Sequence, residues 1–215
     1  MTVKVISTGG HRYSVTGEGY ASVGMIQRTA GDPGKNLDHV FFPCALCTDA
    51  EVRDGQVGGD PTEGALYVLA EKGGLNVGEF RKNYPRIASI PFDSEYEFMA
   101  TFHEMKDTGG KPVIRAYAKG APDIILARSR YGLLADRSIA ELTAQMREVV
   151  LNENDRIAGE GLRVLAFAQG EYDPASFHPD GDLMPLMNDL IITALVGEVD
   201  PPRPEAKSAI EKAHR

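Results

Sequence analysis

The sequence has little positive charge and no long apolar run, and each absence removes a class of protein. Its 215 residues carry 23 Lys and Arg against 31 Asp and Glu, a formal net charge of −8. No cationic run is present to neutralise a nucleic-acid backbone. No stretch approaches the roughly 20 apolar residues of a membrane-spanning helix, and the first residues do not open a signal peptide. We therefore expect a soluble, cytosolic domain that binds no nucleic acid and that needs local cations to hold an anion.

Cysteine is also scarce. Cys44 and Cys47 are the only two, and neither a second pair nor a histidine cluster accompanies them in their apolar segment. A metal site needs more ligands than two cysteines supply, and a redox site needs a different sequence motif around the cysteines. We expect two reduced thiols in the core and no metal site.

Runs of β-branched and aromatic residues predict strands that form antiparallel hairpins. The expected strands cover residues 3–8, 13–16, two short stretches within 51–57, 86–92, 98–103, 113–118, 161–168 and 190–199. Helices are expected over 37–47, from Pro61 to about Lys72, from about Ala121 to Ser129, and over 139–158. The glycine-rich stretch 16–20 has neither a P-loop nor a dinucleotide fingerprint, so we interpret it as a loop.

The stretch Val113–Ile125 predicts a strand that ends in a cation, turns on a glycine and opens a helix. Lys119 supplies an ammonium group, and Gly120 lacks the Cβ that would keep a ligand away from the backbone. Pro122 fits the first helical turn, where its missing N–H costs nothing. Such a junction can bind an anion such as phosphate, but the same residues also fit an ordinary strand-to-helix turn with a surface lysine.

A second candidate lies at the start of the helix from Pro61. Asp60 is a favourable cap, and Pro61 suits the first helical position. Glu63 follows Asp60 by three residues, so its carboxylate could simply reach back to a backbone N–H as a capping residue. Capping and ligand binding both remain open from these residues alone.

Five motifs occur in an order and spacing that resembles the nucleotide-binding domain of type II P-type ATPases, the calcium-pump and sodium-pump group. They are Asp60-Pro61-Thr62-Glu63, Pro91-Phe92-Asp93-Ser94-Glu95, Lys119-Gly120-Ala121-Pro122, Gly161-Leu162-Arg163 and Asp200-Pro201-Pro202-Arg203. The resemblance covers nearly the whole chain. It implies an α+β fold with a mostly antiparallel sheet of six or seven strands flanked by helices over residues 1–199. Residues 200–215 would be the hinge and first helix of a truncated phosphorylation domain.

The resemblance also implies a role for each site residue. Phe92 would stack on adenine, Glu63 would accept a hydrogen bond from the adenine amino group, and Lys119 and Gly120 would line the same pocket. Arg163 would reach the phosphates with its planar fork.

The resemblance extends to partners and chemistry. The domain would bind ATP or ADP as a monomer, with Mg²⁺ in the parent protein, and would deliver the γ-phosphate to an aspartate of the phosphorylation domain. Its other partners would be the actuator and membrane domains of a cation-transporting ATPase, which makes it a cytoplasmic domain of an integral membrane protein. The phosphorylated Asp-Lys-Thr-Gly-Thr segment is absent here, so we assign no catalytic residue and expect ATP binding without hydrolysis. Nothing in the sequence selects the transported cation.

The chain departs from the family pattern in two places. Asp123 stands where a glutamate is usual, which is a mild change. Glu97 stands where a lysine is common; it either opposes the phosphates or faces solvent. The alternative function is therefore a regulatory or partner-binding domain that kept the fold and lost the ligand.

Overall fold

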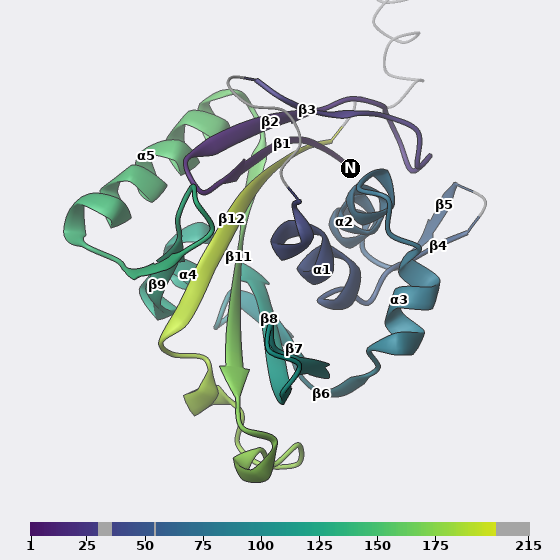
Figure 1. The fold of residues 1–215 in the computed structure, drawn as a ribbon. Helices are drawn as coiled ribbons and strands as arrows, with labels where there is room; N and C mark the ends of the chain where they lie inside the picture. The colour runs from purple at the N-terminus through teal and green to yellow at the C-terminus, as the bar shows by residue number, and fades with distance from the viewer. Residues whose placement is uncertain (30–35, 54, 201–215) are drawn as a thin grey trace, which may run out of the picture.

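The computed structural model describes residues 1–29, 36–53 and 55–200, and one large sheet dominates them (Figure 1). The sheet has ten strands in the order β3-β2-β1-β12-β11-β8-β7-β6, with β9 beside β12 and β10 beside β9. Its pairs are antiparallel except β9–β12, which is parallel. The strands are β1 (Thr2–Thr8), β2 (His11–Val15), β3 (Ile26–Arg28), β6 (Arg86–Asp93), β7 (Phe98–Lys106), β8 (Pro112–Gly120), β9 (Ser129–Leu133), β10 (Ile139–Glu141), β11 (Arg163–Tyr172) and β12 (Leu190–Val199).

The expected α+β class with a mostly antiparallel sheet is confirmed. The sheet is larger than the six or seven strands that the resemblance implied, because β3, β9 and β10 join it. These strands have only 3, 5 and 3 residues, too few for a clear period-2 pattern. The predicted hairpin at 51–57 forms a separate two-stranded sheet of β4 (Glu51–Arg53) and β5 (Gln56–Gly58).

Helices cover both faces of the large sheet (Figure 1). One face carries α1 (Asp38–Leu46), α2 (Pro61–Lys72) and α3 (Val77–Asn83), and the other carries α4 (Pro122–Arg128) and α5 (Ala144–Gly159). Successive residues of β12 pack alternately into the hydrophobic cores on the two faces of the sheet. Ala194 and Val196 pack in the core with α1 and α2, and Leu195 packs in the core with α4 and α5. Strand side chains alternate between faces, so a residue's position in β12 decides which helices it meets.

The predicted helix over 139–158 is wrong at its start. Residues 139–141 form β10, in which Ile139 pairs with Leu133 of β9, and α5 begins only at Ala144. Thr143 caps α5, since its hydroxyl oxygen accepts from the Met146 N–H at 3.2 Å. Ile139 fits the helical spacing by chance, and its strand partner β9 was not recognised. The short helix α3 was also not predicted.

The structure also describes the two cysteines, the connection before β12 and the helices that could be tested for membrane spanning. Cys44 and Cys47 are free, buried thiols, as predicted. The connection between β11 and β12 contains two 3-10 turns, Pro174–Ser176 and Met184–Leu186. In the part of the chain that the structure describes, we find no helix with the length and apolar character that crossing a membrane requires. The predicted hinge and helix beyond Asp200 lie outside the described residues.

Candidate functional site

A buried ion pair joins two of the predicted site residues. Lys119 ends β8 and Glu63 lies in the first turn of α2, 56 residues away in sequence, yet Nζ of Lys119 donates to Oε1 of Glu63 at 2.5 Å. Their side chains are only 8% and 15% exposed. The other carboxylate oxygen of Glu63 accepts from the Asp49 N–H at 2.8 Å. Helix α2 is capped by Asp60, whose Oδ1 accepts from the Thr62 N–H at 2.8 Å. Because Asp60 supplies the cap, the Glu63 carboxylate is left to contact β8 and the loop after α1.

Two arginines hold the loop that contacts Glu63. Arg81 donates to the carbonyl oxygens of Ala45, Thr48 and Ala50 at 2.8, 3.1 and 3.1 Å. Arg86 donates to the Thr48 carbonyl at 3.1 Å and pairs with the Asp49 carboxylate at 2.6 Å. A guanidinium fork suits such multiple acceptors. Sequence reasoning missed both arginines, since no local pattern shows that they reach the end of α1.

Gly120 lies where the turn between β6 and β7 approaches the end of β8. A Cβ at Gly120 would stand 2.4 Å from the carbonyl oxygen of Glu97 and 2.6 Å from Cβ of Phe98. The same Glu97 oxygen accepts from the Ala121 N–H at 3.0 Å. The missing side chain at Gly120 therefore serves close packing of the chain on itself, and Glu97 holds this position with a positive φ of 54°.

Phe92 is exposed at the end of β6, with 61% of its surface accessible. The register between β6 and β7 shifts between Ile90 and Asp93, so Phe92 lies in a bulge, a feature that re-aims side chains. Asp93 pairs with Phe98, and Phe98 pairs with Gly120. Phe92 therefore lies at the same end of the sheet as Gly120 and Lys119.

Arg163 is separated from this group. It opens β11, is exposed, and has no hydrogen bond or ion pair to another described side chain. Phe167, four residues further along β11, is the register partner of Lys119. Arg163 and Phe167 lie on the same face of β11, and at about 3.3 Å per residue Arg163 is about 13 Å along the strand from the level of Lys119. The structure thus brings Glu63 into contact with Lys119, places Phe92 and Gly120 at the same end of the sheet, and leaves Arg163 at a distance.

Glu198 of β12 is a charged residue near the site that sequence reasoning missed. It is fully buried, and its carboxylate has no hydrogen-bond partner among the described residues. Burial raises its pKa to about 8, opposed by the positive charges of Lys119, Arg163 and the Met1 amino group and reinforced by Asp60. The available signal was an acid inside an otherwise apolar strand.

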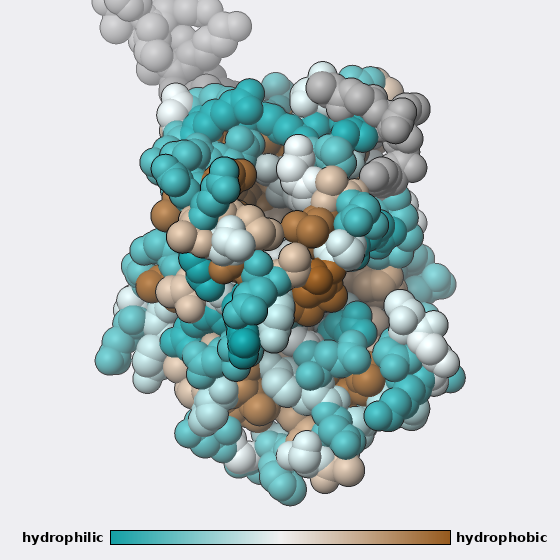
Figure 2. All heavy atoms as spheres, turned by 60° about the vertical axis from the view of Figure 1, so that its left-hand side comes forward, coloured by the Kyte–Doolittle hydropathy of each residue, from teal (hydrophilic) through white to brown (hydrophobic). Residues whose placement is uncertain are grey.

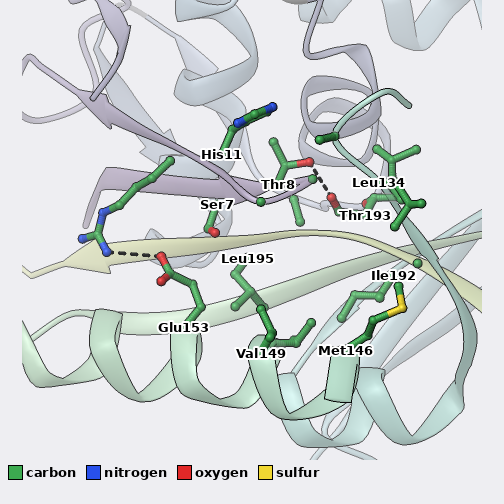
Figure 3. Close-up of a pocket in the computed structure, with 18 of the residues that line it drawn as sticks. Ser7, Thr8, His11, Leu134, Met146, Val149, Glu153, Ile192, Thr193 and Leu195 are labelled. Atoms are coloured by element: carbon green, nitrogen blue, oxygen red, sulfur yellow. Dashed lines mark hydrogen bonds and ion pairs between the residues drawn. The ribbon is translucent and has the colours of Figure 1, made fainter. Parts of the chain in front are cut away.

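A cavity of about 710 Å³ lies on the other face of the sheet, away from the predicted residues. Figure 3 shows Met146 and Val149 of α5 opposite Ile192 and Leu195 of β12. Arg12 and Glu153 also line it and form an ion pair at 3.2 Å. Figure 2 shows hydrophobic residues around a hollow on the side that carries α5. None of the five predicted site residues lines this cavity.

Comparisons with known proteins identify the family of the chain. A family model described as the P-type ATPase cytoplasmic domain N matches residues 36–205. The cation-transporting ATPase pma1 of Synechocystis sp. is 35% identical over 227 residues, which cover 100% of this chain and 24% of that protein. A calcium-transporting ATPase of Bacillus subtilis is 32% identical over 99% of this chain and 24% of its own length. Calcium-transporting ATPase 1 of Lactococcus lactis is 34% identical over 79% of this chain and 18% of its own length.

The chain thus spans about a quarter or less of the curated relatives it matches. The family match extends over most of the sequence, including α2, the turn after β8 and the start of β11. By this match, the chain belongs to the family of P-type ATPase cytoplasmic N domains.

Proposed function

We propose that this chain is the ATP-binding domain of a cation-transporting P-type ATPase. The observation that carries the proposal is the buried Lys119–Glu63 pair at the same end of the sheet as the exposed ring of Phe92, within a chain of this family. An exposed phenylalanine at the same sheet end as a fixed carboxylate and an ammonium group suits an aromatic base that carries an amino group and an anionic tail.

The adenine end would be held by Phe92 and Glu63. The ring of Phe92 offers an open face for stacking. The Glu63 carboxylate is fixed by Lys119 and by the Asp49 N–H, and an ionised carboxylate has about four lone-pair sites. It can therefore accept from an adenine amino group while it keeps both present contacts. Guanine carries a carbonyl at the equivalent position, which this carboxylate would repel.

The phosphate end would be held by Arg163, while Lys119 lines the adenine end beside Glu63. The about 13 Å between their levels along β11 leaves room for a nucleotide that extends from one to the other. Arg163 is exposed, and its guanidinium matches oxyanion geometry. Gly120 would shape the Lys119 end of the site by letting the β6–β7 turn pack against the end of β8. The five residues supply no cluster of carboxylates for Mg²⁺, so we assign the metal to the parent protein.

In the parent protein, an enzyme, the domain would carry ATP to a phosphorylation domain and place the γ-phosphate for in-line transfer to an aspartate. That domain, an actuator domain and a membrane domain would be its partners, and cation transport would follow from the phosphorylated state. The isolated chain would bind ATP as a monomer without hydrolysing it. In the parent protein, the domain would lie on the cytoplasmic side of the membrane.

Titration of the domain with ATP, ADP, adenosine and GTP, followed by amide chemical shifts, tests the proposal. We expect ATP, ADP and adenosine to shift amides of residues 60–63, 91–97 and 118–121, and GTP to bind more weakly. Equal binding of GTP would show that Glu63 does not read the amino group. Labelled ATP with Mg²⁺ should yield neither steady phosphate release nor an acid-stable phosphoprotein.

One observation favours the second candidate, a regulatory domain without a nucleotide. The exposed Glu97 places an acidic residue where its backbone touches the Lys119–Ala121 turn, and the Lys119 charge is already paired with Glu63. No amide shift with any of the four ligands would support this alternative.

A further inference from the structure

Glu198 is the buried group whose position has no packing explanation. Its carboxylate is fully buried, and neither oxygen has a hydrogen-bond partner among the described residues. An unpaired buried carboxylate is costly, and native structures seldom keep one without a role. The strand β12 around it is otherwise nearly all apolar, so a hydrophobic side chain would fit the strand as well.

The side chain of Glu198 faces the predicted nucleotide site. A Cβ on the preceding Gly197 would meet Ile157 of α5 and Leu162, so the next residue, Glu198, faces α1 and α2. Its register partner on β11 is Arg163, which alternation puts on the same face. The charged and titratable groups that interact electrostatically with Glu198 come from several elements around it: Lys119 of β8, Arg163 of β11, Asp60 before α2, Cys44 of α1, Tyr20 and the Met1 amino group.

We propose that Glu198 is a positioning residue for the phosphate end of the nucleotide site: as a neutral acid it leaves Arg163 to the phosphates, and as an anion it competes with them for Arg163. The inference rests on the proposed function and adds a proton dependence to it. Glu198 itself is too deeply buried to contact the ligand, so it would act through Arg163, its register partner.

The competition has a thermodynamic consequence. A bound polyphosphate and an ionised Glu198 are both anions near the Arg163 guanidinium, so phosphate binding favours the protonated acid, and protonation favours binding by the same factor. One linked proton changes an affinity by at most about tenfold per pH unit. Because burial raises the pKa of Glu198 to about 8, the change should fall between pH 7 and pH 9. Adenosine has no phosphates and should not show it.

The experiment measures dissociation constants of ATP, ADP and adenosine by calorimetry at pH 7, 8 and 9. It uses the wild-type domain, Glu198→Gln, and Glu148→Gln as a matched control. Glu148 is an exposed acid on α5, on the opposite face of the sheet. We expect ATP and ADP affinities of the wild type and of Glu148→Gln to fall several-fold from pH 7 to pH 9, within the limit set by one proton. Glu198→Gln should keep its pH 7 affinity throughout.

A second readout follows the proton itself. The carbon-13 shift of the Glu198 carboxyl should titrate in the same range, and saturating ATP should move its midpoint to higher pH. A purely structural role would alter unfolding without this shift. If Glu198→Gln does not fold, Glu198→Met supplies the same uncharged state.

Two results separate the inference from the proposed function. ATP binding that is as strong at pH 9 as at pH 7, or that weakens equally in wild type and Glu198→Gln, overturns the inference and leaves the function standing. Absence of binding by ATP and adenosine at every pH overturns the proposed function, and the inference with it.

Discussion

Removing Glu63 tests whether the buried ion pair with Lys119 organises the site. Glu63→Ala would leave the Lys119 ammonium, on a side chain only 8% exposed, without its partner, and the Asp49 N–H without its acceptor. Loss of one member of a buried pair costs about 3–5 kcal/mol, and an unsatisfied buried donor costs about 1–3 kcal/mol. The two penalties overlap because the loop can relax, so we expect the free energy of unfolding to fall by about 3–5 kcal/mol.

Urea denaturation at pH 7 measures this loss, and an exposed pair supplies the control. Arg53 and Glu51 form an ion pair at 2.7 Å with side chains 81% and 59% exposed, so Glu51→Ala should cost less than about 1 kcal/mol. The double variant Glu63→Gln/Lys119→Met removes both charges, and it should be more stable than Glu63→Ala. If Glu63→Ala costs no more than Glu51→Ala, or if the double variant is no more stable than Glu63→Ala, Lys119 does not depend on Glu63 and the reasoning is wrong.

Three further predictions concern single residues. Phe92→Ala should weaken ATP and adenosine binding by about 1–3 kcal/mol in calorimetry and leave urea denaturation unchanged, because the ring is 61% exposed; unchanged binding would contradict stacking. Glu97→Lys should strengthen ATP binding by a few tenths to about 2 kcal/mol at low salt, and adenosine binding less; an equal change for both ligands would mean that Glu97 does not face the phosphates. Burial lowers the pKa of His103 to about 4, below its ordinary value of 6.5, so the stability from neutral His103 should be present above pH 6.5 and be lost as the pH falls through 4. His103→Gln should flatten this loss in urea denaturation at pH 7 and pH 5, and an unchanged pH dependence would assign it elsewhere.

Local signals predicted the elements that have strong local causes. Asp60 and Pro61 fixed the start of α2, and the Asp-Gly turn fixed the β4–β5 hairpin, because caps and tight turns act through neighbouring residues. The short β10 failed because Ile139 suits a helix and a strand equally well, and only its partner β9 decides between them.

The sequence identified the candidate site residues, but it could not show which of them contact one another. The motifs pointed to Glu63 and Lys119 separately, while their direct contact depends on the tertiary fold that places the start of α2 at the end of β8. Arg81 and Arg86 have no local signature because their acceptors are backbone carbonyls of a distant loop. Glu198 was visible as an acid in an apolar strand, but its burial beside Arg163 required the register of β11 and β12.

The pairing of β1 with β12 has a mechanical consequence. Thr2 is the register partner of Val199, so the start of β1 and the end of β12 lie side by side at one end of the hydrogen-bond ladder between these two strands. A pull applied to these two points would load the terminal hydrogen bonds first and open the pair one rung after another, because ladder bonds run across the strands. The domain should therefore yield at low force in this direction, by unzipping, and resist far more when it is pulled along the length of β12 from opposite ends.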